Sequence, residues 1–350
     1  MNQTLFIDGI GLSFEVGKTV LQIARDNGIY IPTLCYHPRT GQASMCRLCV
    51  VEVDGMRNLQ TACSLYPTDG MKVLTKSPKV IESREMVVNL LLSNGNHDCL
   101  SCEVNGDCEL QDAAYHLGIE TPAYLVREKE PKDTSAPFVM FDSNKCIQCG
   151  RCVKGCNDQV GNEVLDFGYR GDKTRVICDA DEPMGSSSCV QCGECVQLCP
   201  VGAFIDKKGM GTARRWETRK VRTTCPYCGV GCQLELHVKG EQIIRVTGVE
   251  GAQPNNGKLC VKGRYGYDFI YSKDRLTVPL IREEDGFREA SWDEALDLIA
   301  HKFQQIIDES GPDALAGVSS SRTINEDSYY MQRLYREVIG TNNIDNCARV

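Results

Sequence analysis

The residues with the clearest chemistry are two runs of cysteines between positions 145 and 200. In each run three cysteines stand two residues apart and a fourth follows after three residues: Cys146, Cys149, Cys152 and Cys156, then Cys189, Cys192, Cys195 and Cys199. A cubane 4Fe-4S cluster needs four thiolates at its corners, and three closely spaced cysteines let one short loop bind three of them. The fourth cysteine of such a run binds the neighbouring cluster. The spacing therefore predicts two 4Fe-4S clusters in this stretch.

The ligands of these two clusters follow from the exchange of the fourth cysteine. Cluster one is expected at Cys146, Cys149, Cys152 and Cys199, and cluster two at Cys189, Cys192, Cys195 and Cys156. Pro200 follows Cys199 as in the bacterial two-cluster ferredoxins, which this stretch resembles, although no proline follows Cys156. The alternative is a pair of zinc sites, since C-x-x-C also suits tetrahedral zinc. The duplicated spacing favours iron–sulfur clusters, because it leaves surplus thiols around a four-coordinate ion.

A third set of cysteines lies near the N-terminus, and its members are Cys35, Cys46, Cys49 and Cys63. Two pairs of thiolates suit a 2Fe-2S rhomb. Gly41, Ala43 and Ser44 stand between the first two cysteines, where small residues would let backbone amides approach the sulfides. We expect a 2Fe-2S cluster here, and a zinc site is the alternative.

A histidine stands beside the fourth set, which comprises Cys99, Cys102 and Cys108. Three cysteines and an imidazole can hold a 4Fe-4S cluster, so His97 is the expected fourth ligand and Asp98 a weaker candidate. The alternative reading of His97 is an ordinary surface residue. A fifth set is formed by Cys225, Cys228, Cys232 and Cys260, whose spacing predicts another 4Fe-4S cluster.

Composition limits the setting in which these clusters work. The 350 residues include 21 cysteines, and 47 acidic against 39 basic residues give a net charge of −8. Residues 1–17 lack the pattern of a secretory signal peptide, so we expect a cytoplasmic protein with metal-bound thiolates, and no membrane span. Its acidity argues against a nucleic-acid partner. The basic stretch 207–222 is expected to cover a neighbouring domain or a partner instead.

Short elements must position the cysteine loops. Residues 5–7 and 12–15 predict a hairpin, followed by a helix that Thr19 and Gln22 cap and Gly28 ends. A helix is expected over 81–93 before the His97 loop, and another over 109–123 after it. Cys178 lies between the two central runs, belongs to no motif and is expected to be a buried thiol.

The last eighty residues have the pattern of an α/β segment. Ser291 begins an amphipathic helix over 292–306, and residues 314–318 predict a buried parallel strand. Ser320, Ser321 and Arg322 follow in a loop before a helix over 326–338. Such a loop can bind a pyrophosphate through free backbone amides. Plain scaffold is the alternative, because any α/β crossover looks similar.

Several of these motifs resemble known families. The N-terminal cysteine set resembles the domain shared by the complex I large subunit, iron-only hydrogenases and NAD-linked formate dehydrogenases. These families carry a His-Cys cluster with three residues between histidine and cysteine; here one residue intervenes. Cys-Pro-Tyr-Cys-Gly-Val-Gly-Cys at 225–232 and Leu-Cys-Val-Lys-Gly-Arg at 259–264 resemble molybdenum or tungsten bis-pterin oxidoreductases. That resemblance implies that Lys262 lies between cluster and pterin as an electron conduit.

Formate dehydrogenase, soluble and NAD(P)- or ferredoxin-linked, fits all these segments together. Complex I subunits have one central cluster rather than two, and hydrogenases continue into a different catalytic domain. The expected fold is α+β and multidomain. It comprises a β-grasp 2Fe-2S domain (1–79), a His/Cys cluster domain (80–125), a two-cluster ferredoxin (138–207), a pterin-type 4Fe-4S domain (218–274) and an incomplete α/β molybdopterin domain (275–350).

The resemblance implies one 2Fe-2S and four 4Fe-4S clusters, with Mo or W bis-molybdopterin guanine dinucleotide in the full-length protein. Electrons from formate oxidation to CO2 would then pass through the Cys225 cluster and the two central clusters. They would leave through the His97 and Cys35 sites or a docked flavoprotein, NAD(P)-binding or ferredoxin-linked. The alternative is a free-standing five-cluster electron-transfer subunit of a hydrogenase or an NADH dehydrogenase-like complex.

The final residues generate a first prediction. Residues 340–350 resemble formate dehydrogenase catalytic subunits, in which the next position is the selenocysteine or cysteine that binds the metal. On this alignment Cys347 is not that ligand, and the catalytic residue is expected directly after Val350. We therefore expect a UGA codon after the Val350 codon, with an open frame that begins with histidine. Genomic sequencing across this codon checks it, and an ordinary terminator with no continuing frame would contradict it.

Overall fold

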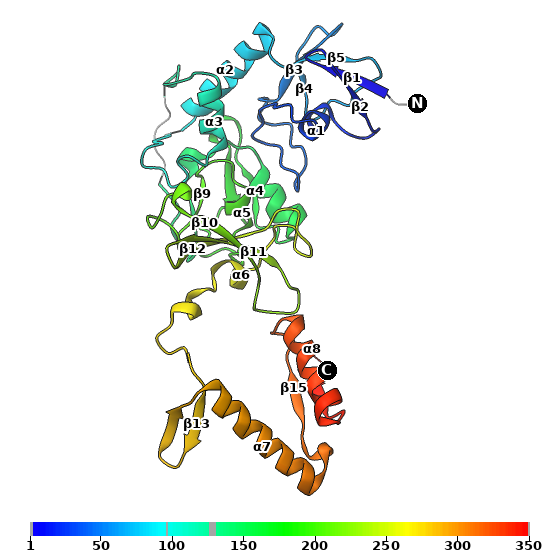
Figure 1. The fold of residues 1–350 in the computed structure, drawn as a ribbon. Helices are drawn as coiled ribbons and strands as arrows, with labels where there is room; N and C mark the ends of the chain where they lie inside the picture. The colour runs from blue at the N-terminus through cyan, green and yellow to red at the C-terminus, as the bar shows by residue number, and fades with distance from the viewer. Residues whose placement is uncertain (1–2, 96, 126–130, 349–350) are drawn as a thin grey trace. The chain divides into compact units, whose positions relative to one another are not determined.

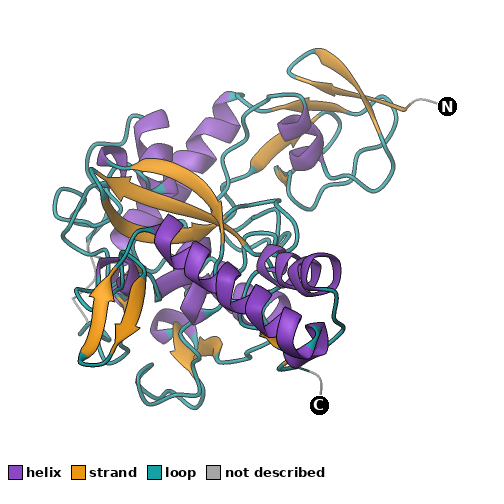
Figure 2. Ribbon diagram, turned by 60° about the horizontal axis from the view of Figure 1, so that its bottom comes forward, coloured by secondary structure: helices purple, strands orange, loops and turns teal. Residues whose placement is uncertain are grey.

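The computed structural model describes residues 3–95, 97–125 and 131–348. The chain divides into two compact units, each of which mixes helices and strands (Figures 1 and 2). The first unit comprises residues 1–219 and 237–245, and the second comprises residues 220–236 and 246–350. The two units are described separately below.

The first unit begins with a five-stranded sheet in the order β2-β1-β5-β3-β4. Its strands are β1 (Gln3–Ile7), β2 (Ile10–Phe14), β3 (Val50–Val53), β4 (Gln60–Thr61) and β5 (Lys72–Leu74). Strand β1 pairs antiparallel with β2 and parallel with β5, and β3 runs antiparallel to both β4 and β5. The expected hairpin is confirmed.

Helix α1 (Val20–Asp26) packs on this sheet because its apolar face is buried. Val20, Leu21 and Ala24 are fully buried in a core with residues of β1 and β3. The Thr19 side chain accepts from the backbone N–H of Gln22, and the Gln22 side chain accepts in return from the Thr19 N–H at 2.9 Å. The predicted capping box is confirmed, and it fixes the residue at which helix α1 begins.

Two helices follow the sheet. Helix α2 (Pro78–Ser93) is capped by Ser77, whose side chain accepts from the Val80 N–H. The buried guanidinium of Arg84 in this helix donates to the carbonyl oxygens of Thr75 and Val50. Helix α3 (Glu109–His116) is shorter than the predicted 109–123. It ends before Gly118, whose positive φ of +68° reverses the chain, so the expectation of a longer helix was wrong.

The central part of the first unit consists of short elements around the two cysteine runs. They are β6 (Val139–Phe141), η1 (Ser143–Lys145), α4 (Arg151–Lys154), a π-helical turn η2 (Gly155–Gln159), β7 (Leu165–Gly168), η3 (Gly171–Lys173), β8 (Arg175–Cys178), α5 (Glu194–Leu198), β9 (Phe204–Asp206) and η4 (Arg215–Glu217). Strand β6 pairs antiparallel with β9, and β7 with β8. These two ribbons flank the cysteine loops.

One hydrophobic core joins these parts of the first unit. Its buried members come from the loop after α1, from helices α2 and α3, and from the central cysteine runs: Leu34, Cys35, Cys46, Leu48, Val88, Leu110, Ala113, Ala114, Ile147, Cys149, Val201 and Ala203. Because cysteines of different predicted clusters lie in the same core, its packing fixes their loops relative to one another.

The remaining elements begin with a three-stranded sheet of order β10-β11-β12. They are β10 (Arg219–Thr224), β11 (Gln233–Lys239), β12 (Gln242–Gly248), α6 (Val261–Tyr265), η5 (Asp268–Tyr271), β13 (Leu280–Glu283), β14 (Gly286–Glu289), α7 (Trp292–Ser310), η6 (Pro312–Ala314), β15 (Gly317–Ser319), α8 (Asn325–Arg333), a π-helical turn η7 (Leu334–Ile339) and β16 (Ile344–Asn346). Cys347 directly follows β16.

The C-terminal part of the second unit has local structure with little burial. Ser291 caps α7 as predicted, accepting from the backbone N–H of Glu294 at 3.1 Å. Strand β15 is parallel to β16, also as predicted, but Val318 is 74% exposed. The expectation of a buried strand was wrong, because the described residues place only β16 beside it. Trp292 and Leu296 on the apolar face of α7 are also exposed.

Across the described residues, none of the helices combines the length and the apolar character that crossing a membrane requires.

Candidate metal centres

The N-terminal cysteine set converges at one end of the first sheet. Cys35 and Cys46 lie in the loop after α1, Cys49 directly precedes β3, and Cys63 follows β4. All four are buried, with at most 8% of their surface exposed. The sulfur of Cys63 also lies 3.8 Å from the Ser44 hydroxyl oxygen. The fold thus gathers four thiols from two loops at one place.

The sulfur contacts join all four residues in a chain, from Cys46 to Cys35, from Cys35 to Cys63 and from Cys63 to Cys49. Hydrogen bonds from the Cys46 and Cys63 thiols lower the pKa of Cys35, and one from Cys63 lowers the pKa of Cys49. Thiols that lie this close together can all bind one iron–sulfur cluster as thiolates, because the positive charge of the iron–sulfur core offsets theirs. The four residues fit the predicted cofactor in chemistry and in arrangement.

The predicted histidine and its three cysteines line one small cavity. His97, Cys99, Cys102 and Cys108 all face this cavity, and so does Asp98. The His97 Nε2 atom lies 3.2 Å from the Leu91 carbonyl oxygen. An N–H donated there leaves Nδ1 as the lone-pair nitrogen, which is the arrangement of a metal-binding imidazole. Burial lowers the pKa of His97 and favours this neutral form.

Gly202 closes the same cavity from the central cysteine run. A Cβ atom at this position would lie 2.8 Å from the Cys102 sulfur and 3.0 Å from a Val104 methyl carbon. Only a residue without a side chain fits, so the backbone can approach the sulfur closely. Lys145 also lines the cavity and provides positive charge beside the thiols. The close backbone at Gly202 and the positive charge of Lys145 suit a cluster that is negatively charged together with its thiolate ligands.

Cluster one has a small cavity of its own. The predicted ligands Cys146, Cys149, Cys152 and Cys199 line it, with apolar neighbours such as Val176 and Phe204. Burial raises the pKa of Cys146 to about 12 and that of Cys149 further. A thiolate in such surroundings needs a compensating cation, which a bound cluster supplies.

Cysteines of the predicted cluster two also lie together. Burial raises the pKa of Cys195, and the charges of Cys192, Cys189 and Cys156 raise it further. The Gln191 side chain donates to the Cys189 sulfur at 3.2 Å, and that of Asn162 to Cys192 at 3.7 Å. Cys178 is buried as predicted, and burial raises its pKa to about 12, which keeps this unassigned thiol protonated.

The two central cysteine runs repeat the same local geometry. Gln148 and Gln191 both have a left-handed backbone, with φ of 54° and 55°, and each N–H donates to the preceding cysteine sulfur at 3.4 Å. Gly150 and Gly193 follow as left-handed caps of α4 and α5. A repeated turn in two loops is typical of an internal duplication that presents three sulfurs each time.

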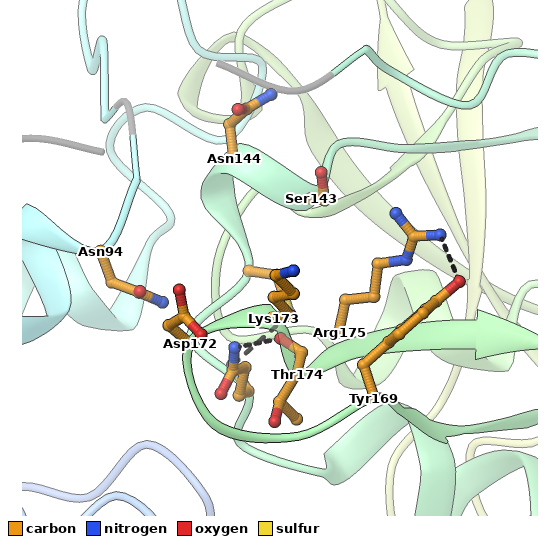
Figure 3. A pocket seen from close by; sticks show the side chains of 10 residues that line it. Asn94, Ser143, Asn144, Tyr169, Asp172, Lys173, Thr174 and Arg175 are labelled. Carbon is orange, nitrogen blue, oxygen red and sulfur yellow. Dashed lines mark hydrogen bonds between the residues drawn. The ribbon is translucent and has the colours of Figure 1, made fainter. Parts of the chain in front are cut away.

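A polar pocket opens beside cluster one (Figure 3). Cys146 lines both this pocket and the cluster-one cavity. Gln148 donates to the Thr174 carbonyl oxygen at 2.6 Å, and Arg175 donates to the Tyr169 hydroxyl at 3.4 Å (Figure 3). The pocket therefore brings polar groups to the Cys146 side of cluster one.

The fifth cysteine set lies in the second unit. The Cys225 N–H donates to the Cys232 carbonyl oxygen at 2.8 Å, which closes the loop between β10 and β11. Cys228 and Cys260 are near enough for their charges to raise the pKa of Cys232, after burial as the main cause. The Nζ atom of Lys262 in α6 lies 5.9 Å from the centre of the Tyr227 ring.

The suggested pyrophosphate loop follows β15. Ser320 and Ser321 both contact the Cys347 sulfur, and the Ser321 N–H donates to it at 3.3 Å. This backbone amide is therefore not available to a pyrophosphate. These bonds lower the pKa of the Cys347 thiol to about 7. The Arg322 N–H donates to the Ser320 hydroxyl at 3.1 Å. The structure brings the three predicted residues together without further indication of a ligand.

Sequence reasoning missed several residues that the structure places at these sites. Gly202 and Lys145 reach the His97 cavity from the central run, and Arg151 lies beside Cys149. Their positions in the sequence carry no spacing signal. These residues are not metal ligands, and they reach the sites only because the cysteine-bearing segments pack against one another.

Five family models match the chain, in order along it. They describe a 2Fe-2S iron–sulfur cluster binding domain (2–78), an NADH-ubiquinone oxidoreductase-G iron–sulfur binding region (84–123), an NADH-quinone oxidoreductase subunit 3 ferredoxin-like domain (136–205), a molybdopterin oxidoreductase Fe4S4 domain (218–272) and a molybdopterin oxidoreductase (275–350). The chain thus carries iron–sulfur domains followed by molybdopterin oxidoreductase sequence.

Curated relatives align with nearly the whole chain. YjgC of Bacillus subtilis, described as a "Probable oxidoreductase", is 38% identical over 99% of the chain. The "Putative formate dehydrogenase YrhE" of the same organism is 35% identical, and a protein of Staphylococcus aureus with the same description is 34% identical, each over 98% of the chain. The chain spans 39% of the length of these relatives.

A solved structure resembles part of the chain. One chain of an NAD+-reducing [NiFe]-hydrogenase in the H2-reduced state is 34% identical, with a TM-score of 0.58. The match covers 61% of this chain and 92% of that one.

The histidine site yields a second prediction. We expect His97→Cys to keep its cluster and to lower the reduction potential by on the order of 100 mV, because a thiolate adds negative charge where imidazole is neutral. A redox titration followed by electron paramagnetic resonance measures this. The control is Asp98→Asn, which should change neither signal nor potential. Unchanged signals in His97→Cys would contradict ligation, and a changed cluster in Asp98→Asn would assign the ligand to Asp98.

A third prediction concerns Gly202. Gly202→Ala should lower the iron occupancy of the His97 cluster, because its Cβ would press on the Cys102 sulfur. The other clusters should keep their signals. Iron analysis and spin quantitation measure the effect. Gly11→Ala is the matched control, since its Cβ would meet the Phe6 ring at 3.3 Å and a Thr4 methyl carbon at 3.8 Å, and no cysteine. Full occupancy in Gly202→Ala would show that this backbone does not cradle the cluster.

Proposed function

Because the chain belongs to the iron–sulfur oxidoreductases that combine these cluster domains with a molybdopterin domain, we propose that it is the electron-transfer part of a formate dehydrogenase catalytic subunit. The carrying observation is the alignment of 98% of the chain with relatives that bear the name formate dehydrogenase. In this proposal formate is oxidised to CO2, or the reverse reaction runs.

The proposed ligands are those of the five cysteine sets. The sheet with α1 corresponds in the proposal to a β-grasp domain over 1–79, followed by the His/Cys domain, the two-cluster ferredoxin and the pterin-type domains with the boundaries given above. The convergence of the thiols and the cradle at Gly202 support this assignment. Val350, after which the catalytic residue is expected, lies outside the described residues.

When bound, the clusters carry single electrons, and a Mo or W pterin centre would accept the electron pair released from formate. The residues of this chain hold and separate these groups. Cysteine thiolates and His97 bind the clusters, and apolar neighbours exclude water, which together set the potentials. Lys262 is proposed to lie between the Cys225 cluster and the pterin, with Tyr227 beside its ammonium group. Ser320, Ser321 and Arg322 are proposed to contact the pterin dinucleotide.

The partners in this proposal are a flavoprotein that binds NAD(P), or ferredoxin-linked electron-transfer subunits, in the cytoplasm. The similarity of 61% of this chain to a chain of an NAD+-reducing hydrogenase supports an electron-transfer partner of that class. The same similarity also supports the second candidate function, a carrier subunit that serves a separate catalytic chain.

A fourth prediction separates the two candidates. The protein expressed from its complete gene and purified without oxygen should contain Mo or W with pterin besides iron, and formate should reduce its clusters. Metal analysis and absorbance at the cluster bands measure this. Iron without Mo or W, together with no reduction by formate, would assign the carrier function instead.

The order of the clusters is tested in the same protein. Cys232→Ser should abolish reduction of the other clusters by formate while dithionite still reduces them, because the Cys225 cluster would be lost. Cys178→Ser is the matched control, a buried cysteine outside all five sets. Normal reduction by formate in Cys232→Ser would show that the Cys225 cluster does not connect the metal centre to the others.

A further inference from the structure

Arg151 occupies the centre of the first unit. It lies in α4, between the cluster-one ligands Cys149 and Cys152, and only 3% of its surface is exposed. An arginine remains charged in any protein environment, so its burial demands compensation. What surrounds the guanidinium therefore indicates its role.

The guanidinium contacts segments of two other predicted clusters. Its Nη1 and Nη2 atoms donate to both carboxylate oxygens of Glu109 at 2.6 and 2.7 Å, and Nη2 also donates to the Tyr36 carbonyl oxygen at 2.8 Å. Glu109 directly follows Cys108 of the His97 site, and Tyr36 directly follows Cys35 of the 2Fe-2S site. One rigid fork thus connects loops of three cluster sites.

The positive charge also acts on cluster one itself. Burial raises the pKa of the Cys149 and Cys199 thiols of that site, and the charge of Arg151 acts against this rise. Among the described residues the buried Nε–H of Arg151 has no hydrogen-bond partner. A buried cation between two cluster ligands in the chain stabilises extra negative charge on the cluster, which is what reduction adds.

The equivalent position of the other run carries the opposite charge. Glu194 stands two residues after Cys192, as Arg151 stands two residues after Cys149. Glu194 is 1% exposed and forms an ion pair with Arg39, which lies in the loop that carries the 2Fe-2S ligands. Both halves of the duplicated stretch therefore reach the N-terminal domain through a buried charge at the same place, but only cluster one has a cation there.

Stability alone is a weak reason for such a pair. Burying the Arg151 guanidinium removes its charge from water, and this costs free energy that its attraction to the half-exposed Glu109 does not have to recover. A charge that also contacts three cluster loops has a further effect, since net charge and hydrogen bonds to sulfur set cluster potentials.

We propose that Arg151 is a positioning residue that fixes the loops of three clusters to one another and raises the reduction potential of cluster one. The inference rests on the proposed function, because it requires clusters at the predicted ligands. It makes cluster one a favoured acceptor among its neighbours.

The test uses two substitutions with opposite expected signs, made in the protein with its clusters loaded. Arg151→Met removes the cation and should shift the one-electron reduction equilibrium of cluster one about tenfold toward the oxidised form, about 59 mV lower. Glu109→Gln removes the anion that neutralises Arg151 and should raise the potential. Its shift should be smaller, about threefold, because water screens the half-exposed Glu109. The double variant should return toward the wild-type value.

Redox titration by electron paramagnetic resonance measures these potentials, with cluster one identified as the signal lost in Cys146→Ser. Arg57→Met, at an exposed arginine, is the matched control and should leave every potential unchanged. Disturbed packing would shift both single variants the same way, so equal signs, or no shift in either, would overturn the proposal. If Arg151→Met fails to assemble cluster one, Glu109→Gln decides alone. A potential of cluster one that does not rise in Glu109→Gln would then overturn the proposal.

Failure of this inference differs from failure of the proposed function. A wild-type protein without 4Fe-4S signals would contradict the cluster assignment itself. Normal signals with unshifted variants would contradict only the role of Arg151.

Discussion

The first unit depends on one shared hydrophobic core that contains cysteines of more than one cluster site. Cys35, Cys46 and Cys149 are buried in it, and Cys108 packs against it. Electron transfer needs redox groups held at fixed separations, and a well-packed interior holds them so, because close-packed side chains leave few alternative arrangements. Separate domains joined by linkers would leave each cluster loop to move independently. Here the loop after α1, helices α2 and α3 and the duplicated cysteine runs instead share their apolar contacts.

Charge is distributed so that this packing remains possible. Thiolates in apolar surroundings are costly, and the first unit places the cations Lys145 and Arg151 near them. Backbone N–H groups add to this at Gln148 and Gln191, where a left-handed turn aims the amide at the preceding cysteine sulfur. The same turn recurs in both runs, while the charged residue two positions after the second cysteine differs. The duplicated loops therefore share a geometry and differ in electrostatics.

The second unit shows the opposite balance of local and tertiary structure. Its helices and strands form where capping and periodicity place them, yet the apolar face of α7 and the residue Val318 are exposed. Helix α7 has a side-chain cap at Ser291 and a long amphipathic sequence, and these suffice for the element without a covering partner. The cysteine loop at 225–232 is more compact, because a backbone hydrogen bond from the Cys225 N–H to the Cys232 carbonyl oxygen closes it.

The sequence by itself determined the cysteine sets, the hairpin, the capped helices α1 and α7, and the pairing of β15 as a parallel strand. These depend on residue types at short spacings, and the domain matches agree with the cofactors expected from them. It misjudged the length of α3, because the left-handed Gly118 outweighs the helical pattern beyond it. Only the tertiary structure placed Gly202 against the Cys102 sulfur and joined Arg151 to Glu109 and Tyr36. Residues 42 and 115 positions apart carry no periodic signal, so contacts between cluster segments arise from packing that spacing cannot encode.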